Sequence, residues 1–123
     1  MYNTKIIVYN ISIPREKGKY MKHRAFGNTG VQVSEISLGT WQLGGKWGAD
    51  YSDKIAQATM ETAFDQGINF FDTADVYNGG ESEKSIGRFI KSKQGKVFVA
   101  TKCGRQINPH TAAGYTREAV VKY

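Results

Sequence analysis

The chain has 123 residues, which is enough for one domain at most. Hydrophobic residues make up 40% of it, enough for a core, and no stretch is long and apolar enough to span a membrane. The formal net charge is +6, but residues 1–24 hold six Lys or Arg side chains and one Glu, so +5 of that charge lies there. The remainder is almost balanced, which argues against a basic face for nucleic acid.

Cysteine usage and the first residues indicate the compartment. Cys103 is the only cysteine, so the chain cannot form an internal disulfide, as is usual in the reducing cytoplasm. The first residues lack an apolar run long enough for a secretory signal. We therefore expect a cytoplasmic protein.

Residues 1–20 differ in character from the rest, because a regular pattern of elements begins directly after Met21. We predict a leader over 1–20 and a folded region over 21–123. The leader is either a disordered extension or upstream sequence read before a true start at Met21. Both alternatives stay open.

The folded region opens on a predicted β-hairpin. Two short extended runs, 21–26 and 31–33, flank a turn of Gly, Asn and Thr residues in which positive φ is needed. A strand over 36–41 follows, and it leads into a glycine-rich loop with two indoles, Trp41 and Trp47.

A helix over 54–66 comes next, with Ser52 and Asp53 suited to cap its start and Gly67 placed to end it. Its inward face is predicted to consist of Ile55, Thr59, Ala63 and Gln66, or of the neighbouring Ala58 and Met60.

The central stretch begins with a short apolar run over 68–71, which is typical of a buried parallel strand. Asp72 marks its end, and Tyr77 lies five residues later in a loop. Ser82 is the predicted N-cap of a helix that runs to Lys91. The inner face of that helix is predicted to carry Ile86, Phe89 and Ile90.

A turn at 94–95, a strand over 96–102 and a last helix capped by Thr116 complete the chain. The predicted strand ends, Thr40, Asp72 and Lys102, are 32 and 30 residues apart. That is the period of strand–helix units in a parallel α/β fold with right-handed crossovers.

Asp72, Tyr77 and Lys102 are predicted to converge, because the carboxyl ends of parallel strands meet at one rim. A tyrosine has an ordinary pKa of about 10, and a neighbouring ammonium lowers the pKa of a phenol by stabilising the phenolate. A buried lysine in turn needs a counter-charge such as a carboxylate. Such a tyrosine can give a proton to a carbonyl oxygen while hydride arrives at the carbon. Each residue alone would have an ordinary structural explanation.

Several pieces in the right order resemble the aldo-keto reductase superfamily over residues 21–123. They are the hairpin turn 27–30 and the stretches 33–41, 71–77, 80–83 and 100–102. The resemblance implies an α/β fold that is the N-terminal part of a (β/α)8 barrel, with about three strand–helix units after a hairpin that plugs the floor. It also implies reduction of aldehydes or ketones to alcohols with NADPH and without a metal.

The resemblance assigns roles residue by residue. Tyr77 matches the proton donor, Lys102 the lysine that tunes it, and Asp72 the carboxylate paired with that lysine. The cofactor-binding residues that it implies are Thr40, Trp41 and Asp72, and the substrate pocket that it implies is formed by Trp41, Val76 and Trp47. The family's catalytic histidine would follow the next strand, beyond residue 123, so we expect this stretch alone to lack activity.

Two other functions remain open. The superfamily also includes subunits that hold the cofactor and serve mainly as partners or sensors. Alternatively, the chain is a non-functional fragment whose open parallel edges favour aggregation. For the reductase, the expected partner is a small-molecule carbonyl substrate, with no nucleic acid and no membrane.

Overall fold

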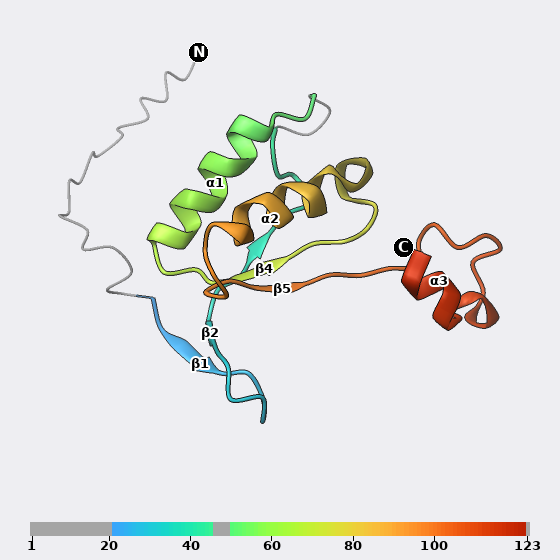
Figure 1. The fold of residues 1–123 in the computed structure, drawn as a ribbon, viewed down its shortest axis with the longest axis horizontal. Helices are drawn as coiled ribbons and strands as arrows, with labels where there is room; N and C mark the ends of the chain where they lie inside the picture. Colours follow the sequence, from blue (N-terminus) through green and yellow to red (C-terminus); the bar gives the residue numbers. More distant parts are fainter. Residues whose placement is uncertain (1–20, 46–49, 123) are drawn as a thin grey trace, which may run out of the picture.

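A computed structural model describes residues 21–45 and 50–122; the predicted leader and Trp47 lie outside the described residues. In chain order (Figure 1) the elements are β1 (His23–Ala25), β2 (Gln32–Ser34), β3 (Leu38–Gly39), α1 (Asp53–Asp65), β4 (Phe70–Asp72), the 3-10 turn η1 (Tyr77–Gly80), α2 (Glu81–Lys91), β5 (Phe98–Ala100), the 3-10 turn η2 (Ala112–Gly114) and α3 (Arg117–Lys122). Within the described ranges, no helix is long and apolar enough to cross a membrane.

The strands form an antiparallel hairpin and a separate parallel sheet, as predicted. β1 pairs with β2, and the sheet has the order β3-β4-β5. In this sheet Asp72 lies opposite Gly39 on one side and Ala100 on the other. Three strand–helix units therefore follow a hairpin, and the sheet is open rather than closed into a barrel. The paired segments are shorter than the predicted strands, although backbone hydrogen bonds continue the ladder past β5, from Asp75 N to Lys102 O at 3.0 Å.

Helices α1 and α2 lie side by side on one face of the sheet, whereas α3 lies apart from them (Figure 1). The core is formed between these two helices and the strands. Phe71 of β4 stacks on Phe89 of α2 with ring centroids 5.7 Å apart, and both are fully buried. The buried cluster consists of Leu43, Ala56, Met60, Phe71, Ile86, Phe89 and Val97. The predicted inner face of α2 is thus confirmed, with Ile90 partly buried beside it.

The inner face of α1 agrees with the prediction only in part. Met60 and Ala63 are buried as predicted, and Ala56, which was not predicted, is buried beside them. Ile55 is instead 52% exposed, and Ala58 and Thr59 are exposed as well. The reason is the open edge of the sheet. Ile55 lines a groove beside Leu38 of β3, where no further described strand covers it. The smaller Ala56 instead faces the sheet.

Two of the predicted helix caps are confirmed. The hydroxyl of Ser52 accepts a hydrogen bond from Ile55 N at 3.4 Å, and that of Thr116 accepts one from Ala119 N at 3.2 Å. Gly67, just beyond α1, has the expected positive φ of 89°.

The predicted N-cap of α2 is wrong. Gly80 occupies that position with φ of 90°, and Ser82 lies inside the helix, fully buried. A hydroxyl chain explains why: Ser82 Oγ donates to Thr40 Oγ1 at 2.8 Å and lies 2.9 Å from Thr73 Oγ1. Thr40 Oγ1 in turn donates to Asp72 O at 2.8 Å. This hydroxyl chain joins the ends of β3 and β4 to the start of α2.

The hairpin is fixed to the opposite end of the sheet by Asn69, which directly precedes β4. Asn69 Oδ1 accepts from Ser34 N at 2.7 Å, and Asn69 Nδ2 donates to Gln32 O at 3.0 Å. The rings of Phe26 and Phe70 add an apolar contact with centroids 5.5 Å apart. The hairpin therefore covers the amino ends of the strands, as a barrel floor would require.

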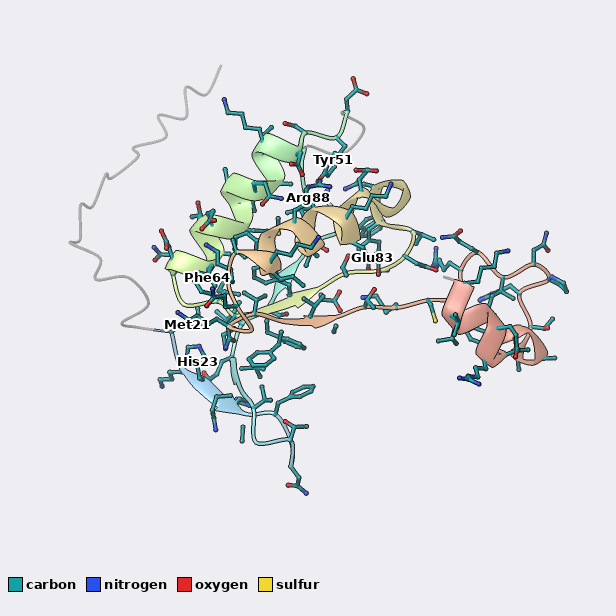
Figure 2. The ribbon with its side chains drawn as sticks, in the orientation of Figure 1. Met21, His23, Tyr51, Phe64, Glu83 and Arg88 are labelled. Atoms are coloured by element: carbon teal, nitrogen blue, oxygen red, sulfur yellow. The ribbon has the colours of Figure 1, made fainter. Side chains whose placement is uncertain are left out.

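A cluster of polar side chains around Asp53 joins the two helices. Asp53 Oδ1 accepts hydrogen bonds from Arg88 at 2.5 Å, Ser85 at 2.8 Å and Tyr51 at 3.2 Å. Figure 2 shows Tyr51 and Arg88 close together beside α1 and α2. The hydrogen bond from Arg88, followed by that from Ser85, lowers the pKa of Asp53 from 3.8 to about 2.

This cluster predicts an acid-sensitive contribution to stability. Because the pKa of Asp53 is lower in the folded state, its contribution is present above the unfolded value of 3.8 and is lost as the pH falls through about 2. The Tm difference between the wild type and Asp53→Asn should be largest near neutral pH. It should shrink as the pH falls from 3.8 to about 2. Asp50→Asn, an exposed carboxylate outside the cluster, is the control. A gap that stays constant down to pH of about 2 would contradict the assignment.

The hydroxyl chain predicts a second stability effect. Ser82→Ala leaves the buried hydroxyl of Thr73 without its side-chain partner and removes the donor to Thr40 Oγ1, which keeps its bond to Asp72 O. The change should lower the free energy of unfolding by about 1–3 kcal/mol. Urea denaturation measures the change. Ser37→Ala, at an exposed position, should change it by less than about 0.5 kcal/mol. Equal effects of the two substitutions would show that the hydroxyl chain adds no stability.

Candidate active site

Three side chains meet at the carboxyl ends of β4 and β5, where the sequence predicted them. Lys102 Nζ donates to both carboxylate oxygens of Asp72, at 2.8 and 2.9 Å. The same nitrogen lies 5.2 Å from the ring centroid of Tyr77. The parallel register brings them together, because Asp72 lies opposite Ala100 and Lys102 follows two residues later on the same edge.

The ion pair is half exposed, not buried as the sequence-based argument assumed. The side chain of Lys102 is 51% exposed and that of Asp72 is 44% exposed. The hydrogen bond to Asp72 is the main cause that raises the pKa of Lys102 above 10.5, and the nearby Tyr77 contributes less. The ammonium therefore stays charged at neutral pH, beside the phenol.

Tyr77 is held by its neighbours in the loop after β4. Its ring stacks on that of Trp41, with centroids 6.2 Å apart and an interplanar angle of 21°. The next residue, Asn78, has φ of 49° and donates from Nδ2 to Leu43 O at 2.8 Å. Asparagine tolerates this left-handed conformation better than most residues. Asn78 thus ties the Tyr77 loop to the Trp41 loop, a role that the sequence analysis missed although an Asn before a Gly pair signals such a turn.

A cleft of about 500 Å³ opens beside these side chains. Trp41 and Val76, two of the three residues predicted to form a substrate pocket, line it together with Tyr77 and Lys102. Its remaining lining residues are Ala74, Asp75, Cys103 and Arg105. Neither Asp75 nor Arg105 was predicted from the sequence to be a site residue.

Thr40 is placed differently from Trp41. Its side chain is fully buried in the hydroxyl chain and supports the Asp72 backbone from below the cleft. The cofactor-binding role of Thr40 stays a prediction.

Asp75 fixes the loop that follows β5. Its side chain is buried, and its Oδ2 accepts a hydrogen bond from Gly104 N at 3.3 Å. Its backbone N–H donates to Lys102 O at 3.0 Å. The two bonds join the loops that carry Tyr77 and Lys102. The signal in the sequence was a second acidic residue three positions after Asp72.

The arrangement suits proton donation to an oxygen in the cleft. The Tyr77 ring lies on the wall of the cleft, 5.2 Å from the ammonium of Lys102. The carboxylate keeps that ammonium in place through two hydrogen bonds of ordinary length.

Comparison with known proteins matches most of the chain to one family. The sequence profile of the Aldo/keto reductase family matches residues 35–123. L-galactose dehydrogenase from Arabidopsis thaliana is 47% identical over 85 residues, covering 67% of this chain and 26% of that protein. Aldo-keto reductase YhdN from Bacillus subtilis (strain 168) is 39% identical over 84 residues, covering 67% of this chain and 25% of that protein. The chain spans about a quarter of the length of these relatives.

Solved structures agree with the fold. Aldo-keto reductase AKR11C1 from Bacillus halodurans, in its holo form, matches 76% of this chain and 29% of its own length, with a TM-score of 0.60 and 32% identity. Glycerol dehydrogenase AKR11B4 from Gluconobacter oxydans matches 67% of this chain and 25% of its own length, with a TM-score of 0.57 and 38% identity. Because the profile covers more than half of the chain, this chain belongs to the aldo/keto reductase family.

Proposed function

We propose that the protein carrying this chain reduces aldehydes or ketones to alcohols with NADPH, and that Tyr77 is its proton donor. The observation that carries the proposal is the position of the Tyr77 ring, 5.2 Å from the ammonium of Lys102 and on the wall of a cleft. Membership of the aldo/keto reductase family supports the reaction class. The proposal concerns the whole protein, since the chain spans about a quarter of its curated relatives.

The proposed reaction adds a hydride to the carbonyl carbon and a proton to the carbonyl oxygen, which gives an alcohol. NADPH, when bound, supplies the hydride and becomes NADP⁺. The Tyr77 hydroxyl supplies the proton and is left as a phenolate, which regains a proton from solvent. A positioned acid of this kind contributes roughly 100-fold to 10,000-fold to a rate.

Lys102 and Asp72 have supporting roles in this mechanism. The ammonium of Lys102 stabilises the phenolate as the proton leaves Tyr77. Asp72 receives two hydrogen bonds from Lys102 and so fixes where the ammonium lies. Because the pair is half exposed, we assign it to orientation and charge rather than to stability.

The residues present fit the nicotinamide end of such a cofactor. Trp41 offers a flat, mostly exposed indole face in the cleft, next to the proton donor. Asp72 keeps an exposed carboxylate that can accept hydrogen bonds from ribose hydroxyls. We propose that these two residues contact the cofactor and that Trp41 and Val76 also border the substrate.

Removal of one oxygen atom tests the role of Tyr77. In the longest natural form of the protein, Tyr77→Phe should lower kcat for aldehyde reduction by about 100-fold to 10,000-fold, because the proton donor is lost while the ring remains. NADPH oxidation is followed at saturating cofactor with a panel of aldehydes and ketones. The Kd for NADPH should change little.

The matched control is Tyr51→Phe, which removes a hydroxyl from the Asp53 cluster instead of the cleft. It should keep its turnover. Equal turnover of Tyr77→Phe and the wild type, or no NADPH oxidation by the wild type with any carbonyl compound, would refute the proposed function.

A further inference from the structure

The cleft holds a second cation, Arg105, that the reduction mechanism does not use. Arg105 lines the cleft together with Tyr77 and Lys102, and it is exposed to solvent. Within residues 21–45 and 50–122, no carboxylate lies within ion-pair distance of its guanidinium. In contrast, the charge of Lys102 is already paired with Asp72. Arg105 is therefore the cation of this cleft that is open to an anion from outside.

The backbone under Arg105 is firmly held. The preceding residue, Gly104, donates its N–H to the buried carboxylate of Asp75, and its carbonyl accepts from Ile107 N at 3.0 Å. Gly104 has φ of 117°, and a Cβ there would lie 2.4 Å from the ring of Tyr115. This close packing fixes the point from which the Arg105 side chain extends.

We infer that Arg105 binds an anionic group of the carbonyl substrate, so that the protein prefers aldehydes or ketones that carry a carboxylate. The inference rests on the proposed function of the same cleft. A guanidinium forms two parallel hydrogen bonds with a carboxylate, which gives both attraction and orientation. With the anion on Arg105 and the carbonyl oxygen at Tyr77, the apolar part of the substrate would lie against Trp41.

A guanidinium suits a carboxylate of the substrate and a phosphate of the dinucleotide alike, so the experiment must separate the two sources. Two aldehydes of nearly equal size do this: 4-carboxybenzaldehyde carries the anion and 4-methylbenzaldehyde does not. The kcat/KM of each is measured in the longest natural form of the protein, together with the KM for NADPH. The variants are Arg105→Gln and Arg105→Lys, with Arg117→Gln on α3 as a charge-matched control away from the cleft.

The wild type should favour the carboxylated aldehyde. Arg105→Gln should lower kcat/KM for that aldehyde by about tenfold to a hundredfold, mainly through KM, because a charged hydrogen bond is lost. It should change kcat/KM for 4-methylbenzaldehyde by less than about twofold. Arg105→Lys keeps the positive charge but cannot form two parallel hydrogen bonds with the carboxylate. Its kcat/KM for 4-carboxybenzaldehyde should therefore lie between the values for the wild type and Arg105→Gln. Arg117→Gln should leave the ratio unchanged.

Two outcomes would overturn the inference while leaving the reductase intact. One is that Arg105→Gln leaves the ratio of kcat/KM for 4-carboxybenzaldehyde to kcat/KM for 4-methylbenzaldehyde unchanged. The other is an equal loss with both aldehydes and a raised KM for NADPH, which would assign Arg105 to a cofactor phosphate.

If the wild type reduces neither these two aldehydes nor any other carbonyl compound, the proposed function fails, and a binding measurement decides the anion site. Benzoate and the neutral benzyl alcohol are titrated while the indole NMR signal of Trp41 is followed. Benzoate binding that disappears in Arg105→Gln supports the anion site. Binding that is absent, or equal in both proteins, overturns it.

Discussion

The register between β4 and β5 is the constraint on which the site depends. Asp72 lies opposite Ala100, and this pairing places Lys102 within reach of the carboxylate. An exposed ion pair contributes only about 0–1 kcal/mol to stability, so the pair cannot itself hold the strands in register. The register is fixed instead by the backbone pairing of β4 with β5 and by the packing of Phe71 on Phe89. The fold therefore does not depend on the charges of Asp72 and Lys102 for its stability.

The side chains at the two ends of the sheet differ in kind. At the amino ends, Asn69 and the hairpin satisfy backbone groups and cover the strands. At the carboxyl ends, the buried hydroxyls of Thr40, Thr73 and Ser82 link the strands to α2. Three uncharged hydroxyls can be buried there because each has a partner, whereas the charged groups lie above them, half in solvent. The hydroxyl chain is thus a rigid base under a polar cleft.

Sequence reasoning predicted the elements and the three converging side chains, because both follow from short-range patterns. Alternating strands and helices at a regular period place Asp72 and Lys102 on one edge. The predictions were wrong where contacts between residues far apart in the sequence determine whether a side chain is buried. Ser82 has the chemistry of an N-cap, yet its partner Thr40 is 42 residues away and draws it into the interior. Ile55 looked like a core residue, but the open edge of the sheet leaves it exposed. Asp75 and Arg105 were missed because their significance depends on a loop packed against Gly104.

In the proposed function, substrate choice and proton delivery depend on different side chains of the cleft, Arg105 and Tyr77. The ammonium of Lys102 is already paired with the carboxylate of Asp72, which makes it less available to an incoming anion. Arg105 lies on the loop after β5, whereas Tyr77 lies on the loop after β4. Asp75 holds the backbones of these two loops together, so we expect a substitution of the exposed side chain at position 105 to leave the phenol in place. If Arg105 acts as we infer, substitutions in the loop after β5 change the substrate preference while the Asp72–Lys102 pair and Tyr77 stay the same.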